Sequence, residues 1–102
     1  MSEDQKVALI TAGASGIGRA ISLAMQRAGY RVHVADISGE AIAAVAASTP
    51  EITATQADLG EAADAERVFQ DCMNHHGRVD VLVNNVGIAG ATARVEDAGT
   101  DD

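Results

Sequence analysis

Short apolar runs recur along this chain, separated by longer segments in which apolar and polar residues alternate with a helical period. The first run is Val7–Thr11, and further runs lie at 31–36, 52–57 and 79–83. Val7–Thr11 shows no alternation, which is typical of a strand that is covered on both faces, as in a parallel sheet. We therefore predict a strand at each of the four runs.

The segments between these runs are predicted to be helices. In the first, Ile17, Ile21 and Met25 recur every fourth residue as one apolar stripe, and Gly29 ends the helix. The second spans 40–47 between a capping Ser38 and Pro50, and the third spans 61–76 and ends at Gly77. The third is expected to turn four side chains inward: Val68, Phe69, Cys72 and Met73.

The resulting order is β-α-β-α-β-α-β with helix-length connections. Because such crossovers are right-handed, the order predicts an α/β fold, a parallel sheet with helices on both faces. Residues 1–6 read as a polar tail and 88–102 as a loop.

The charge of the chain excludes two classes of partner. Seven basic residues against fifteen acidic ones give a formal net charge of −8. We expect such a chain to repel nucleic acid and anionic membranes. A small phosphate ligand stays possible, because a helix N-terminus binds phosphate through backbone N–H groups. The single cysteine, the acidic N-terminus and the absence of a long apolar run favour a cytoplasmic protein.

The segment TAGASGIG, residues 11–18, joins the first strand to the first helix. A glycine-rich turn in this position, followed by an acidic residue at the end of the next strand, is typical of dinucleotide binding. Asp36 ends the second strand, 18 residues beyond Gly18. The simpler alternative is a structural turn, since strand-to-helix turns often use glycine. No Lys-Ser or Lys-Thr follows the glycines, so the segment is not a P-loop.

Three motifs together resemble the short-chain dehydrogenase/reductase family. Thr11-x-x-x-x-Gly16-Ile17-Gly18 resembles the family's Thr-Gly-x-x-x-Gly-x-Gly element, and Asn84-Asn85-Val86-Gly87 resembles its Asn-Asn-Ala-Gly. Asp58-Leu59 stands where the family places an acidic and an apolar residue beside the adenine. The resemblance covers residues 6–88 and implies a Rossmann-type doubly wound sheet.

The resemblance also implies a cofactor, NAD, and the residues that bind it. Asp36 would accept hydrogen bonds from the adenosine ribose hydroxyls, which favours NAD over NADP because its carboxylate repels a 2′-phosphate. The implied cofactor-binding residues are Gly13, Ser15, Gly16, Ile17, Gly18, Asp36, Asp58, Leu59, Asn85 and Gly87. Two alternatives stay open: Asp58 as a plain turn residue, and the asparagines as partners for backbone groups, the role we expect of Asn84.

The chain departs from the family pattern at two positions. Ala12 replaces the first glycine, and Val86 replaces an alanine. An alanine with φ above zero would cost about 1 kcal/mol. We therefore expect Ala12 to keep a negative φ, or the turn to shift to Gly13.

The remaining chemistry-bearing residues favour structural roles. His75 and His76 close the third helix, where a cation is favourable, and no metal-ligand cluster surrounds them. His33 is expected to be packed in the sheet or at its edge, and Cys72 to be a small core residue.

Catalytic residues cannot be assigned within the 102 residues. The family uses a Tyr-x-x-x-Lys pair with a serine, but Tyr30 is followed four residues later by Val34, and Lys6 is the only lysine. We expect residues 1–102 to be the N-terminal part of one dinucleotide-binding domain, whose catalytic part lies beyond residue 102. The whole would be a homo-oligomeric dehydrogenase, a dimer or tetramer, acting on a small alcohol or carbonyl substrate. The alternatives are a non-catalytic dinucleotide-binding or interaction module and, more distantly, a methyltransferase.

Overall fold

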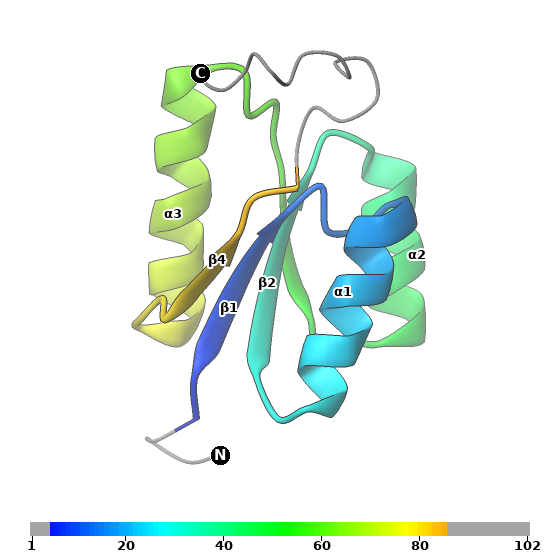
Figure 1. Ribbon diagram of the computed structural model, residues 1–102. Coiled ribbons are helices and arrows are strands. Elements are labelled where there is room, and N and C mark those ends of the chain that lie inside the picture. The colour runs from blue at the N-terminus through cyan, green and yellow to red at the C-terminus, as the bar shows by residue number, and fades with distance from the viewer. Residues whose placement is uncertain (1–4, 86–102) are drawn as a thin grey trace, which may run out of the picture.

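The computed structural model describes residues 5–85 (Figure 1). Four strands alternate with three helices, as the apolar pattern predicts. The strands are β1 (Val7–Thr11), β2 (Arg31–Asp36), β3 (Thr53–Gln56) and β4 (Val81–Val83). The helices are α1 (Gly16–Arg27), α2 (Gly39–Ser48) and α3 (Ala62–His76). Among the described residues, none of these helices is long and apolar enough to cross a lipid bilayer.

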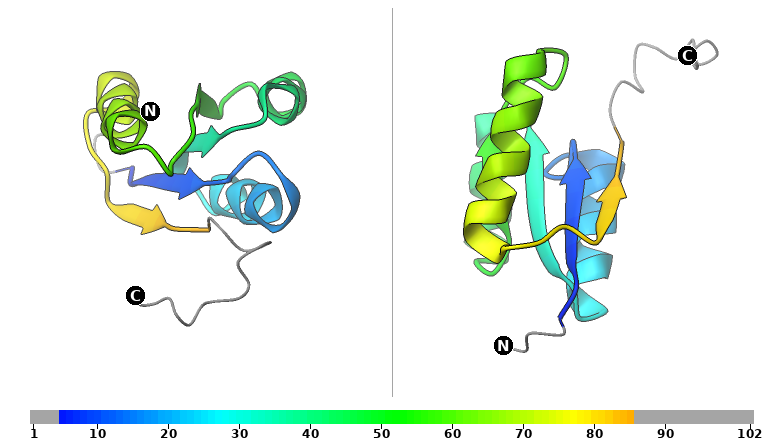
Figure 2. Two further views of the ribbon diagram at one scale, coloured as in Figure 1. Left: turned by 90° about the horizontal axis from the view of Figure 1, so that it is seen from above. Right: turned by 90° about the vertical axis from the view of Figure 1, so that its left-hand side faces the viewer.

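The strands form one parallel sheet in the order β3-β2-β1-β4. Helices α1 and α2 cover one face, and α3 covers the other (Figure 2). The chain therefore winds in one direction from β1 to β3 and then crosses back over β1 to β4. This doubly wound α/β arrangement confirms the predicted fold class, a Rossmann-type sheet.

Alternating side chains of the strands fill two apolar layers. Ala8 and Ile10 of β1 pack under α1 and α2, whereas Val7 and Leu9 of the same strand pack under α3. All four are at most 5% exposed. Strand β1 is thus buried on both sides, which explains its apolar sequence.

The helix ends follow the expected local signals. The Ser38 hydroxyl accepts a hydrogen bond from the Ala41 N–H at 3.1 Å and caps α2. Gly77 ends α3 with a φ of +80°, and Gly29 follows α1 with a φ of +104°. Both angles lie in the left-handed region that glycine adopts at little cost.

Two side chains of the predicted apolar helix stripes are exposed. Phe69 is 49% exposed, so the prediction that it turns inward was wrong, and Ile17, which the family resemblance places at the cofactor, is 74% exposed. Val68 and Cys72 form the buried stripe of α3, and Phe69 points about 100° away from Val68, at the margin of this stripe near the exposed Leu82 of β4. Ile21 and Met25 of the same stripe as Ile17 pack against the core, whereas Ile17, in the first turn of α1, does not.

Candidate functional site

The turn between β1 and α1 has a left-handed residue at Ala12, with a φ of +53°. The expectation that Ala12 keeps a negative φ was therefore wrong, and the turn does not shift its left-handed position to Gly13. Position 13 instead requires glycine because a side chain there would not fit. A Cβ atom there would lie 2.7 Å from Val34 Cγ1 and 2.8 Å from the Ile10 carbonyl oxygen. The left-handed φ costs Ala12 about 1 kcal/mol, because its Cβ approaches the following carbonyl oxygen.

The next two glycines of the motif differ in what surrounds them. Gly16 has a φ of +51°, and a Cβ there would meet no atom within 4 Å. A Cβ on Gly18 would overlap the backbone of Ala12 and lie 2.8 Å from the side-chain amide nitrogen of Asn85. Gly18 thus permits close packing of α1 against the turn, while Gly16 combines a left-handed backbone with open space in front of it.

No side chain caps the N-terminus of α1. Its N-cap residue is Ser15, whose side chain makes no capping hydrogen bond. The hydroxyl instead donates to Asp36 Oδ2 at 2.9 Å. The first N–H groups of any helix lack intrahelical partners, and together with the helix dipole they attract an anion.

Asp36 ends β2 and is 6% exposed. Its Oδ2 also accepts a hydrogen bond from the Ala14 N–H at 3.1 Å, and its Oδ1 accepts one from the Ser38 N–H at 3.0 Å. A carboxylate has about four acceptor positions, so three bonds leave capacity for a further donor. The carboxylate therefore ties the glycine turn to the start of α2, a role that the sequence motif did not predict.

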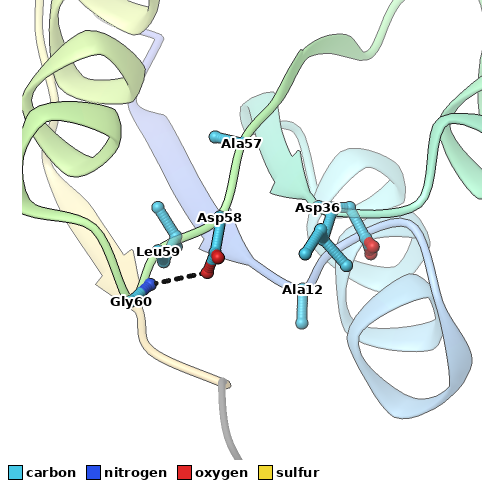
Figure 3. Close-up of a pocket in the computed structure, with 7 residues that line it drawn as sticks. Ala12, Asp36, Ala57, Asp58, Leu59 and Gly60 are labelled. Atoms are coloured by element: carbon cyan, nitrogen blue, oxygen red, sulfur yellow. Dashed lines mark hydrogen bonds between the residues drawn. The ribbon is translucent and has the colours of Figure 1, made fainter.

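A pocket of about 410 Å³ opens beside Asp36 (Figure 3). Its lining comes from the ends of three successive strands: Ala12, Asp36, Ile37, Ala57, Asp58, Leu59 and Gly60. Asp36, Asp58 and Leu59 are expected cofactor-binding residues, whereas Ala57 and Gly60 were not expected at the site. Ile37, the residue directly after β2, is 65% exposed at the pocket.

Asp58 also shapes its own loop. Its Oδ1 accepts a hydrogen bond from the Gly60 N–H at 2.9 Å, which is the dashed line in Figure 3. Its backbone N–H donates to Asp64 Oδ2 at 2.9 Å, and this bond is the main cause that lowers the pKa of the Asp64 carboxyl. The turn role considered for Asp58 is therefore present, on a residue that also lines the pocket.

Polar groups join the ends of β1 and β4. The Thr11 hydroxyl oxygen accepts a hydrogen bond from the Asn85 N–H at 2.7 Å and lies 3.2 Å from Asn84 Oδ1. The side chain of Asn84 therefore contacts another side chain rather than the backbone group expected as its partner. The side-chain nitrogen of Asn85 lies against Gly18, so this segment also meets the glycine turn.

The predicted site residues gather at the carboxyl edge of the sheet, from the ends of β1, β2, β3 and β4. Ligands of open α/β sheets bind at this edge, where the strand order reverses, and here the reversal lies between β1 and β4. Gly87 lies outside the described residues. The other residues expected to be structural behave so: His33 and Cys72 are fully buried. Within residues 5–85, no three His, Cys, Asp or Glu side chains are grouped so that they could hold a metal ion.

Comparison with known proteins identifies the family. Residues 6–102 match the short chain dehydrogenase family. The chain belongs to this family. It is 42% identical over 89 residues to a sorbitol dehydrogenase of Cereibacter sphaeroides, an alignment that covers 86% of this chain and 35% of that protein. The family resemblance inferred from the three motifs is thus confirmed, and the relatives are oxidoreductases.

Solved structures of family members share the fold. A 3-ketoacyl-(acyl-carrier-protein) reductase from Brucella melitensis, complexed with NADH, has a TM-score of 0.73 and 29% identity, covering 79% of this chain and 34% of that one. An ElxO variant with NADPH bound has a TM-score of 0.71 and 27% identity, over 79% and 34% of the two chains. The chain spans about a third of the length of the curated relatives it matches.

Proposed function

We propose that this chain binds NAD(H) for an oxidoreductase that transfers hydride between the cofactor and a small alcohol or carbonyl substrate. One observation carries the proposal. The N-terminus of α1, without a side-chain cap, follows the open backbone at Gly16 and lies beside the pocket at Asp36. These features supply anion-binding N–H groups and a pocket along the same edge of the sheet.

The residues present fit a dinucleotide. The pyrophosphate would lie at the first turn of α1, against Ser15, Gly16, Ile17 and Gly18. The remaining acceptor capacity of Asp36 suits the hydroxyls of the adenosine ribose, and the pocket lined by Asp58 and Leu59 suits the adenine. Asn85, held by Thr11, would face the ribose at the nicotinamide side, together with Gly87.

The bound cofactor would supply the hydride acceptor or donor, and the chain's own residues would hold it. Hydride transfer to or from an alcohol also needs a proton acceptor or donor. No Tyr-x-x-x-Lys pair occurs in these 102 residues, so we place the acid/base group outside them. In this proposal the chain is the N-terminal part of one Rossmann domain. Its assembly into dimers or tetramers and its cytoplasmic location stay predictions.

Two left-handed glycines allow a matched test. Gly16 and Gly77 both have a positive φ, and a Cβ on either would meet no atom within 4 Å. Gly16→Ala and Gly77→Ala should therefore cost a similar free energy of unfolding, about 1 kcal/mol. Only Gly16 lies at the proposed phosphate site. We expect Gly16→Ala to weaken NADH binding at least tenfold in calorimetric titration of the intact protein, and Gly77→Ala to leave it unchanged.

Two results would contradict the proposal. The first is an intact protein that binds neither NADH nor NADPH. The second is an equal NADH affinity in both glycine variants and the parent, because the cofactor would then not contact this turn. Oxidation of NADH on addition of ketones or aldehydes, followed by its absorbance, tests the reaction class separately from binding.

A further inference from the structure

All three histidines of the chain meet in one cluster, although they come from distant segments. His33 lies in the middle of β2, and His75 and His76 form the last turn of α3. The ring centroid of His33 lies 5.6 Å from that of His75 and 6.2 Å from that of His76. Helix α3 runs away from the proposed cofactor site, so the cluster lies toward the opposite end of the sheet.

A continuous chain of side-chain hydrogen bonds passes through His33. Its Nε2 lies 2.8 Å from the Thr55 hydroxyl, which donates to Asp71 Oδ2 at 2.9 Å. Its Nδ1 lies 2.6 Å from the Thr53 hydroxyl, which lies 2.8 Å from His76 Nε2. These hydrogen bonds therefore link α3 to β3 and β2 at two points, Asp71 and His76.

Asp71 sets the direction of these hydrogen bonds while His33 is neutral. A carboxylate only accepts, so the single hydroxyl hydrogen of Thr55 goes to Asp71. Thr55 must then accept from His33, which places the imidazole proton on Nε2 and leaves Nδ1 as an acceptor. The Thr53 hydroxyl lies 2.6 Å from this Nδ1 and 3.4 Å from the Val32 carbonyl oxygen, so we assign its hydrogen to the shorter bond, and Thr53 then accepts from His76 Nε2–H.

This assignment explains a further observation, the orphaned nitrogen of His76. Its Nδ1 is buried and has no hydrogen-bond partner within the described residues. With this assignment the proton of the neutral His76 ring lies on Nε2, so Nδ1 of His76 is an unprotonated acceptor. An acceptor left without a partner costs less than a buried N–H donor would, because an orphaned N–H is the rarer of the two in folded proteins.

A proton added to Nδ1 of His33 would need the Thr53 oxygen as its acceptor. The Thr53 hydroxyl hydrogen would then have to leave Nδ1, which lies 2.6 Å away, and turn to the Val32 carbonyl oxygen at 3.4 Å. The charged groups facing the ring also oppose the proton on balance: His75 and His76 oppose it, while Asp71 favours it. Burial is the largest cause, and together these effects lower the pKa of His33 to about 4. Burial, Arg31 and His75 lower the pKa of His76 as well.

We propose that this cluster is a pH-sensitive latch, in which neutral His33 and His76 hold the last turn of α3 against β2 and β3, and proton uptake releases it. The inference is independent of cofactor binding. A pocket of about 470 Å³, lined by Thr53, His75 and His76 among others, gives water access to the latch. The His33 imidazole is protonated in the unfolded chain below about pH 6.5 and stays neutral in the fold down to about pH 4. Stability should therefore fall with decreasing pH between these values.

The first test is urea unfolding of the intact protein between pH 8 and 5.5, above the range in which most carboxylates titrate. From pH 7.5 to 5.5 the unfolding equilibrium constant should rise about tenfold more in the parent than in His33→Gln, whose amide offers one donor and one acceptor without titrating. His75→Gln is the matched control. The His75 ring takes no part in the hydrogen bonds that run from Asp71 through His33 to His76, so this variant should keep most of the pH dependence.

The second test needs no substitution of His33. In ¹⁵N NMR spectra at pH 7, His33 and His76 should both be neutral Nε2–H tautomers, and His33 should remain so at pH 5.5. Thr53→Val, which removes the linking hydroxyl but keeps the shape, should free His76 to exchange between tautomers. An identical pH dependence of unfolding in the parent and His33→Gln would overturn the latch. So would a His33 ring that is protonated at pH 5.5 in the folded protein.

Discussion

The hydroxyl of Ser15 donates to Oδ2 of Asp36 across 2.9 Å, and this bond joins the first turn of α1 to the end of β2. The two residues are 21 positions apart in the chain. The same oxygen accepts the Ala14 N–H, so the acidic residue of the motif holds the glycine turn in place before any ligand is bound. A preformed turn reduces the entropy lost when a ligand binds, because its N–H groups need no further ordering.

Ser15→Ala tests this coupling. The substitution removes one partly buried hydrogen bond to a charged group, so the free energy of unfolding should fall by about 1 to 2 kcal/mol. NADH affinity should fall severalfold, since the turn loses one of the bonds that order it. Urea unfolding and calorimetric titration measure the two effects. Ser48→Ala is the control: its hydroxyl lies at the far end of α2, bonded to the Val45 carbonyl, and its loss should not change NADH affinity.

Ala12→Gly should stabilise the protein. The left-handed φ of Ala12 costs an alanine roughly 1 kcal/mol relative to glycine. Ala20→Gly is the opposite case, an exposed alanine within α1, where glycine should lower the free energy of unfolding by about 1 kcal/mol. Thermal unfolding of the two variants beside the parent should therefore move the midpoint in opposite directions. A lower midpoint for Ala12→Gly would show that Ala12 has a negative φ in solution.

The fold was predictable because periodicity and end signals agree at each element. Val7–Thr11 is apolar at every position, Gly13 and Gly16 follow it, and Asp36 closes the next apolar run. Each signal reflects a local requirement, such as burial on two faces or a left-handed backbone. Requirements of this kind restrict the residue type at one position, so they can be recognised in the sequence.

Relationships between distant residues were not predictable in the same way. Nothing in the local pattern around Asp36 indicates that it binds Ser15, and the lack of space for a side chain at Gly13 comes partly from Val34, a residue of another strand. The exposure of Phe69 depends on which of two adjacent stripes of α3 meets the sheet. The histidine cluster joins β2 to the end of α3, which only the sheet order brings together.

The last prediction concerns the choice between NAD and NADP. A carboxylate at the end of β2 should repel a 2′-phosphate, with a penalty on the order of several kcal/mol in a partly desolvated site. Because Asp36 also accepts three hydrogen bonds from the protein, Asp36→Ala would disturb the turn itself. Asp36→Asn is the sharper change, since it removes the charge but keeps the shape and one acceptor oxygen.

Asp36→Asn should lower the ratio of NAD to NADP affinity at least tenfold, and adding Ile37→Arg should begin to invert it. Ile37 is exposed at the pocket, so an arginine there can reach a 2′-phosphate without displacing core side chains. Ala20→Arg supplies the same added charge on the outer side of α1 and should leave the ratio unchanged. Calorimetric titration of each intact variant with both cofactors gives the ratio directly. Tighter binding of NADP than of NAD by the parent would show that Asp36 serves the turn alone.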